Sequence, residues 1–317
     1  MRAIAILVAV FLLLAGCTSS PPVGETRLVA KSFDNLNTAS QPLLDELAVA
    51  ERNQGKSAAL TRAEMRTSID STTPIPNSGR CPKILVVDVV SKDMPKVQDG
   101  FCIEDSYYYS DISDPPATRA FRQALAGVGD YTQLLVILAE GRNVAEAKDQ
   151  IMTLTNNLGL ALGAAGTTGL GPTLKVLVNA FDPLLDLAAK RSNAKELQRL
   201  VVQESPKVLN LVAAMRTAAR EFFNTLAEAP LARFNLAIDK PETAKIEAER
   251  IDAYRIAVSN YVVLLDQYEA LLRDLVKVYD HPRGTITLAS LTERSAQLSA
   301  QADAWRRSLA SLRAGLH

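Results

Sequence analysis

Histidine is nearly absent from this sequence. Its 317 residues include only His281 and His317. Catalytic zinc sites commonly use two or three histidines, and the sequence offers no motif with two of them. A serine in the Gly-x-Ser-x-Gly context of α/β-hydrolases is also missing. We therefore expect a protein without a metal, a cofactor or enzymatic activity.

Aromatic residues and net charge are low as well. Aromatic side chains make up 5% of the chain, and 35 Lys and Arg balance 35 Asp and Glu. So few aromatic residues, together with abundant Ala and Leu, favour a helical protein over a β-sandwich. A chain without excess positive charge or a basic block lacks the electrostatic surface that nucleic-acid binding needs. We expect no nucleic-acid partner.

The aliphatic run at the start of the chain is too short to span a bilayer. Ala3–Leu14 covers twelve residues, whereas a transmembrane helix needs roughly 20. Arg2 precedes the run and two small residues follow it, as in a secretory signal. The ending Leu14-Ala15-Gly16-Cys17 resembles the lipobox of bacterial lipoproteins. The resemblance implies that residues 1–16 are removed and that Cys17, linked to diacylglycerol, becomes the N-terminus.

An N-terminal lipid would fix the location of the protein. Each buried methylene contributes about 0.8 kcal/mol, so two or three acyl chains hold a protein on a membrane almost permanently. Cys17 is followed by Thr18 rather than Asp, which resembles the lipoproteins that Gram-negative bacteria pass to the outer membrane. We expect an outer-membrane lipoprotein that faces the periplasm, with residues 17–24 as a flexible tether.

Two cysteines remain, Cys81 and Cys102. An exported compartment is oxidising, so we expect a disulfide between them. A disulfide that closes a loop of about 21 residues stabilises a fold by about 3 kcal/mol. The segment between them contains a β-branched run at 83–90, a turn signal at Asp99-Gly100, and a second β-prone run at 101–111. The pattern predicts a disulfide-stapled β-hairpin.

Apolar residues recur at helical spacing through most of the remaining chain. One helix is expected over 25–69, where Pro42 and Gly55 would kink or split it. Another carries Phe121 to Leu138, and Asn143 with Glu146 forms a capping box for the next. The predicted fold is all-α: an elongated bundle of long antiparallel helices with a small disulfide-stapled β-hairpin. The expected units are 1–16 (signal), 17–24 (tether), 25–79 (helix and loop), 80–112 (hairpin) and 113–317 (helical bundle).

The last two helices have the clearest pattern. Apolar residues alternate by three and four over 243–279 and again from Leu288 to Leu312. The short segment between them makes the helices antiparallel neighbours. Positions equidistant from residue 283 should then meet, which places Trp305 against Tyr261.

Three consecutive tyrosines are the candidate binding residues. In a strand, Tyr107 and Tyr109 would lie on one face and Tyr108 on the other. Exposed tyrosines favour recognition of a protein or a glycan. The alternative is that they pack onto the helical bundle.

Two other segments suggest different functions. Gln203-Glu204-Ser205 resembles the catalytic Glu-Ser of helical lytic transglycosylases, which cleave peptidoglycan, and the resemblance implies that Glu204 is the general acid. It covers three residues, and Ser205-Pro206 also fits a helix start. Residues 150–174 carry no charge over 25 positions, and glycines 159, 163 and 166 would permit tight helix packing in a membrane. The alternative is a helix and turn within the bundle, with "GTTGLG" at 166–171 as the turn.

These observations favour a lipid-anchored, non-enzymatic binding or scaffold protein of the bacterial envelope, whose partner is an envelope protein or glycan. The alternatives are a peptidoglycan-cleaving enzyme that uses Glu204 and a membrane-active protein that inserts 150–174.

Overall fold

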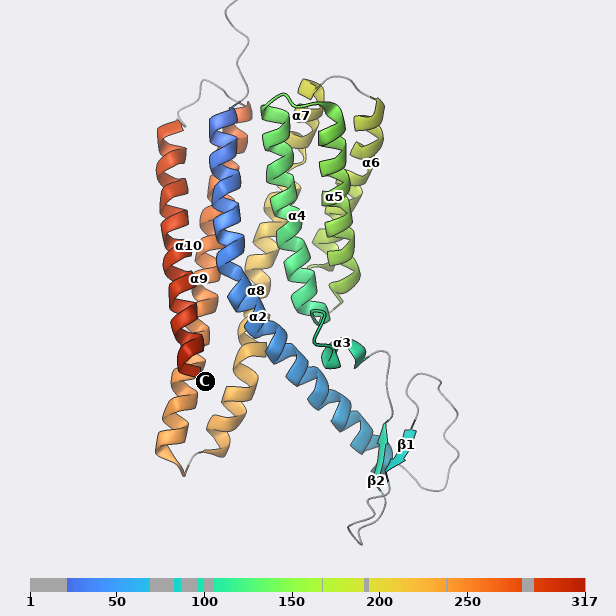
Figure 1. The fold of residues 1–317 in the computed structure, drawn as a ribbon, viewed down its shortest axis with the longest axis vertical. Helices are drawn as coiled ribbons and strands as arrows, with labels where there is room; N and C mark the ends of the chain where they lie inside the picture. The colour runs from blue at the N-terminus through green and yellow to red at the C-terminus, as the bar shows by residue number, and fades with distance from the viewer. Residues whose placement is uncertain are drawn as a thin grey trace, which may run out of the picture.

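The computed structural model describes residues 22–68, 83–86, 96–99, 105–166, 168–190, 194–237, 239–280 and 288–316. Cys17, Cys81 and Cys102 lie outside these ranges. The helices and strands, labelled as in Figure 1, are α2 (Val23–Ser68), β1 (Lys83–Val86), β2 (Lys96–Asp99), α3 (Ser106–Tyr109), α4 (Pro116–Ala139), α5 (Val144–Ala164), α6 (Gly171–Lys190), α7 (Ala194–Gln203), α8 (Ser205–Leu236), α9 (Pro241–Asp280) and α10 (Leu288–Leu316).

The long helices lie side by side along the long axis of the molecule (Figure 1). The helix α9, for example, has 40 residues and spans about 60 Å at 1.5 Å per residue. The helices α4, α5 and α6 alternate in direction, as do α8, α9 and α10, and the apolar stripes of the helices meet in one continuous core. The prediction of an elongated helical bundle is confirmed.

The predicted pairing of the last two helices is also confirmed. The rings of Tyr261 and Trp305 lie 6.2 Å apart between their centroids, and both side chains are buried. The structure adds a third helix, because α10 packs on α2 as well as on α9. Ser295, a small residue in the α10 stripe, hydrogen-bonds to Ser32 of α2, and Asn35 of α2 donates to Ser299 at 2.8 Å.

A row of aromatic rings crosses the middle of the bundle. Phe121 of α4 meets Phe222 of α8 edge-on at 4.2 Å, and Phe222 stacks on Tyr261 of α9 at 5.5 Å. Tyr261 in turn contacts Trp305 of α10. Aromatic pairs at these separations contribute about 0.5–1.5 kcal/mol each beyond the area they bury. The row therefore ties four helices together.

The helix α2 is continuous through Pro42 and Gly55, so neither residue splits it. Pro42 lacks an amide hydrogen and removes one helical hydrogen bond. Figure 1 shows that α2 bends, and that its second part leaves the bundle towards β1 and β2. Among residues 22–59, whose side chains the structure describes, the last buried side chain of α2 is that of Glu51. Residues 52–59 are therefore more exposed than the part of the helix that precedes them.

The predicted start of α5 is confirmed. The side chain of Asn143 accepts a hydrogen bond from the Glu146 amide at 2.9 Å, which caps the helix. After α5 the chain turns within residues 165–170, where Gly169 has a φ of +70°. A positive φ suits glycine because it has no Cβ. The glycine-rich segment is therefore an interhelical turn, and Pro172 lies in the first turn of α6.

The predicted strand over 101–111 is wrong for the tyrosines, because residues 106–109 form the single helical turn α3. The strand that pairs with β1 is Lys96–Asp99, with Lys83 opposite Asp99 and Val86 opposite Lys96. The preference of tyrosine for strands depends on what the side chain packs against, and here Tyr108 packs on α2. The disulfide of the predicted hairpin lies outside the described residues.

Candidate binding site

The three tyrosines of α3 do not share the alternating faces of a strand. One helical turn spreads them around the axis, so each meets a different neighbour. Tyr107 and Tyr109 are 43% and 55% exposed. The ring of Tyr108 turns inward and covers Gly55, where an added Cβ would lie only 2.3 Å from the ring. Gly55 is therefore the residue that lets α3 dock on α2.

Cations from two helices hold the exposed tyrosines. The Arg119 guanidinium of α4 lies 4.1 Å from the centre of the Tyr107 ring, and the Lys56 ammonium of α2 lies 5.6 Å from that of Tyr109. Cation–π contacts at exposed positions contribute about 0.5–1 kcal/mol each. They orient α3 and leave the outer edges of both rings at the surface. Ile112, three residues further on, is 93% exposed.

A cavity of about 420 Å³ lies between α3 and the helices beneath it. Tyr108 forms one wall, and the aromatic row of the core supplies Phe121 and Phe222. Polar groups come from α2, α8 and the turn before α6. The lining residues are Leu47, Glu51, Gln54, Gly55, Ala58, Tyr108, Ala117, Phe121, Thr168, Glu221, Phe222 and Thr225.

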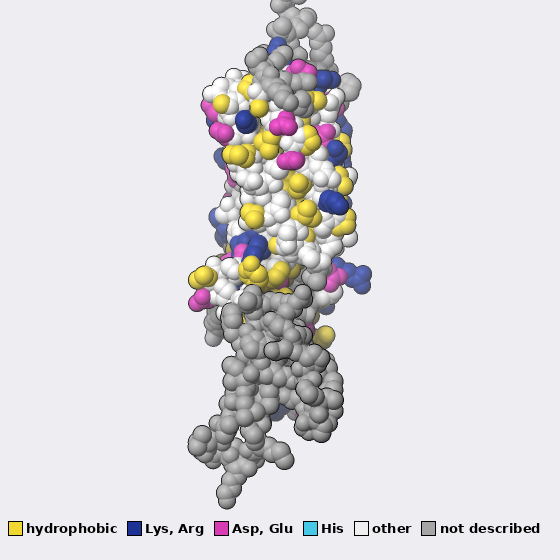
Figure 2. Space-filling view, turned by 90° about the vertical axis from the view of Figure 1, so that its right-hand side faces the viewer, with side chains coloured by type: hydrophobic (Ala, Val, Ile, Leu, Met, Phe, Trp, Pro, Cys, Tyr) yellow, Lys and Arg dark blue, Asp and Glu magenta, His cyan; other side chains and the backbone are white. Residues whose placement is uncertain are grey.

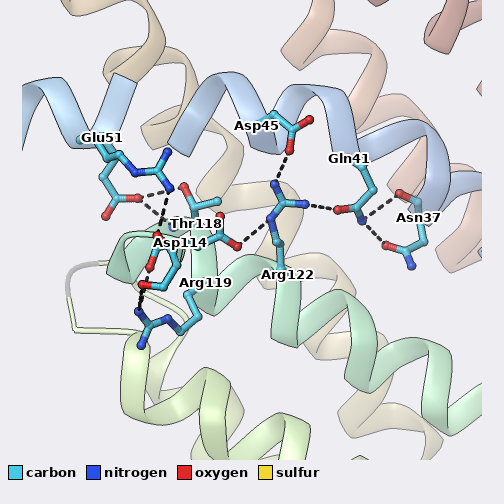
Figure 3. A network of polar contacts seen from close by, with 10 residues as sticks. Asn37, Gln41, Asp45, Glu51, Asp114, Thr118, Arg119 and Arg122 are labelled. Atoms are coloured by element: carbon cyan, nitrogen blue, oxygen red, sulfur yellow. Dashed lines mark hydrogen bonds and ion pairs between the residues drawn. The ribbon is translucent and has the colours of Figure 1, made fainter. Parts of the chain in front are cut away.

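The carboxylate of Glu51 caps the N-terminus of α4. The N-cap residue of α4, Pro115, has no side chain that can accept a hydrogen bond. Glu51 replaces it: it accepts from the amides of Ala117 at 2.8 Å and Thr118 at 2.9 Å, and from the Thr118 hydroxyl at 2.9 Å (Figure 3). The positive end of the helix dipole stabilises this negative charge. The charge of Glu51 is thus used to join α2 to α4.

A second set of polar contacts extends this junction along α2 (Figure 3). Arg122 of α4 pairs with Asp114 at 2.9 Å and with Asp45 at 2.5 Å, and it donates to Gln41. Arg119, which also lies on the Tyr107 ring, donates to the Asp114 carbonyl at 2.8 Å. The segment that connects α3 to α4 is therefore held by α2 and α4 together. This gives the tyrosines a fixed support.

Other ionisable groups with shifted pKa values lie away from the cavity. Burial raises the pKa of Asp130, although it accepts hydrogen bonds from Asn157 and Gln150. Arg27, 2.6 Å away, and Arg142 lower the pKa of Glu140. These groups join neighbouring helices and lie on no cavity wall described above.

Glu204, the candidate general acid, lies at the junction of α7 and α8. It occupies the N-cap position of α8 and pairs with Lys207 at 2.5 Å, with Ser205 and Pro206 following as the first helical residues. Helix α8 therefore begins at Ser205, as the Ser205-Pro206 pattern suggested, with Glu204 as its N-cap residue. Glu204 does not line the cavity under α3. A catalytic role for Glu204 stays a prediction.

The uncharged segment 150–174 forms most of α5, the turn and the start of α6. Its larger apolar side chains Ile151, Leu154 and Leu158 are buried in the bundle. A Cβ added at Gly159, Gly163 or Gly166 would meet nothing within 4 Å, so these glycines serve no close helix contact here. Figure 2, which shows the face at the right of Figure 1, has scattered apolar side chains together with several charged ones and no continuous apolar band. Among the described residues, no helix has the length and hydropathy of a membrane span.

Sequence reasoning selected the tyrosines but missed the residues around them. Glu51, Gln54, Thr168 and Glu221 come from three separate segments, and no local motif connects them. In the part of the chain that the structure describes, no cluster of three or more His, Cys, Asp or Glu is placed to bind a metal ion. No protein family, curated protein or solved structure matches this chain.

Proposed function

We propose that this chain is a non-enzymatic lipoprotein of the bacterial envelope that binds a protein partner through α3. The binding part of the proposal is carried by one observation: Tyr107, Tyr109 and Ile112 are exposed together on a support that α2 and α4 hold in place. Tyrosine and arginine are enriched among the residues that dominate protein–protein affinity. Arg119, stacked on Tyr107, completes such a set.

The location part rests on the lipobox-like sequence at Cys17. Starting from Val23, about 48 Å of helix separates the beginning of α2 from Gly55, counted at 1.5 Å per residue. Figure 1 shows α3 in the half of the molecule opposite the first turns of α2. A lipid on Cys17 would therefore hold the bundle by one end and present α3 away from the membrane surface.

A disulfide between Cys81 and Cys102 belongs to the same proposal. The two cysteines stand two residues before β1 and three residues after β2, in the sequence. An oxidising compartment favours their pairing. The bond would stabilise the β1–β2 pair, which is short for an isolated hairpin and whose strand β2 contacts α2.

The binding proposal is tested by site-specific photocrosslinking in cells. A photoreactive phenylalanine at position 109 should give a discrete crosslinked protein, identified by mass spectrometry. The same probe at Met152, which is 48% exposed on α5, serves as the control. The double change Tyr107→Ala and Tyr109→Ala should abolish partner recovery without changing the helical circular dichroism. Equal crosslinking at both positions, or full recovery by the double variant, would refute the proposal.

A further inference from the structure

A second concave surface lies on the far face of α8, away from the cavity under α3. It is a groove of about 400 Å³ between α8 and α9. Its floor is apolar: Ala219 and Val258 are buried, and Phe223 and Val262 are partly buried. Val263, on its edge, is 49% exposed. The volume lies within the range of about 300–1,000 Å³ typical of small-molecule sites.

Three arginines border this apolar floor. Arg216 closes one end, where it pairs with Asp266 and lies 3.2 Å from Glu269. Arg255 closes the other, where it pairs with Asp252 and lies 5.4 Å from the centre of the Phe223 ring. Both end charges are therefore compensated by carboxylates of α9.

The arginine in the middle is different. Arg220 lies one helical turn from Arg216 on the same face of α8 and lines the groove. Among the described residues it makes no ion pair and no hydrogen bond, and it is exposed. Across the groove α9 presents Ser259 and Val262 rather than a carboxylate. An arginine guanidinium binds a carboxylate through two parallel hydrogen bonds, so Arg220 has the geometry to receive an anion there.

The floor also limits the kind of molecule that carries this anion. Besides the arginines, its polar groups are Thr217 and Ser259, and the Thr217 hydroxyl already donates to the Ala213 carbonyl at 3.0 Å. A bound peptide would bring backbone amides and carbonyls that need partners. A hydrocarbon chain brings none.

We propose that the α8–α9 groove binds a single-chain carboxylate amphiphile of the fatty-acid type. Arg220 binds the carboxylate, and the chain lies on Ala219, Phe223, Val258 and Val262. The site does not depend on the function proposed for α3, since the two surfaces use different residues of α8.

The test is calorimetric titration of the mature chain, residues 17–317, with the change Cys17→Ser. This protein carries neither the aliphatic run Ala3–Leu14 nor a lipid, so it needs no detergent, and the altered residue lies outside the described bundle. Decanoate below its micelle concentration is the probe, decanol supplies the same chain without charge, and acetate supplies the carboxylate without the chain. We expect saturable binding of decanoate. Decanol should bind at least about tenfold more weakly because it loses the charge-assisted contact, and acetate at least about tenfold more weakly because it has no methylene chain to bury.

Two variants separate the groove from other surfaces. Arg220→Gln should weaken decanoate binding about tenfold or more, whereas Arg306→Gln, on the exposed face of α10 and paired with Asp303, should bind like the parent. The double change Tyr107→Ala and Tyr109→Ala should leave decanoate binding unaltered, so the two proposals fail independently. Absence of saturable decanoate binding, equal binding by Arg220→Gln, or binding of an acidic amphipathic peptide in place of decanoate would overturn the inference.

Discussion

Replacing Glu51 tests the junction that supports the candidate binding site. Its carboxylate, on a side chain with 8% of its surface exposed, accepts hydrogen bonds from two amides and a hydroxyl at the start of α4. Glu51→Ala removes all three acceptors at once. Because Pro115 offers no substitute cap, the amides of Ala117 and Thr118 would be left to donate their hydrogen bonds to water.

The magnitude follows from these contacts. Losing a helix cap costs about 0.5–2 kcal/mol, and an amide left without an acceptor costs about 1–3 kcal/mol if it stays dry. The cavity beside Glu51 lets water reach at least one amide, which reduces the cost. We expect Glu51→Ala to lower the free energy of unfolding by about 2–3 kcal/mol. Glu51→Gln keeps one acceptor oxygen, but its NH2 group would face the N–H of the other amide, because the two oxygens of Glu51 accept from different amides. We therefore expect a smaller loss than for Glu51→Ala, about 1–2 kcal/mol.

Equilibrium unfolding in guanidinium chloride, followed by circular dichroism at 222 nm, measures both values. Glu228→Ala is the matched control, because Glu228 is an exposed glutamate whose partner, Gln54, also lies on α2. It should change stability by less than about 0.5 kcal/mol. Hydrogen exchange gives a local readout, since the amides of Ala117 and Thr118 should lose protection in Glu51→Ala. If Glu51→Ala is as stable as Glu228→Ala, the capping role assigned to Glu51 is wrong.

Three further predictions concern the core, the anchor and an interhelical ion pair. Trp305→Ala should lower the free energy of unfolding by about 3–5 kcal/mol, because it deletes a large buried side chain, while the exposed Arg306→Ala should change little; equal denaturation midpoints would contradict this packing. Cys17→Ser should abolish incorporation of labelled fatty acid and, after any signal cleavage, release the protein from membranes; a labelled variant that still sediments with the outer membrane would disprove lipidation. The lowered pKa of Glu140 means that its ion pairs stabilise the fold above the unfolded-state pKa of about 4.5 and are lost as pH falls through the folded-state pKa. Glu140→Gln should therefore melt below the parent at pH 7 and at the same temperature as the parent near pH 2.5; a constant difference between the two would exclude the linkage.

The helices were predictable because their signals are local. The three-and-four alternation that places Trp305 on Tyr261 repeats over several turns of two helices joined by a short segment, so both the buried faces and the register follow from counting. Asn143 caps α5 through its own Glu146, three residues away. Features of this kind need no knowledge of the rest of the chain.

The same alternation did not reveal that α2 packs against α10. Apolar periodicity reports that one face of a helix is buried, but many helices have a compatible face. Ser32 and Ser295 are short polar residues with no pattern of their own, and only their contact shows why each stands in an otherwise apolar stripe. The strand predicted for the tyrosines of α3 was wrong for a related reason. A β-prone run of three residues is a weak local preference, and the packing of Tyr108 on Gly55 of α2 outweighs it.

By itself, the sequence determined the helical class, the bounds of α2 and α9 to within two residues, the capping of α5 and the pairing of α9 with α10. Tertiary structure alone decided that Glu51 of α2 caps α4 and that α3 closes a cavity. It also decided that Arg220, which has no ion-pair partner among the described residues, borders an apolar groove. Each of these depends on side chains from helices far apart in the chain. Local propensity and periodicity act over a few residues. Contacts of this kind form only once the helices are packed against particular neighbours at particular crossing angles.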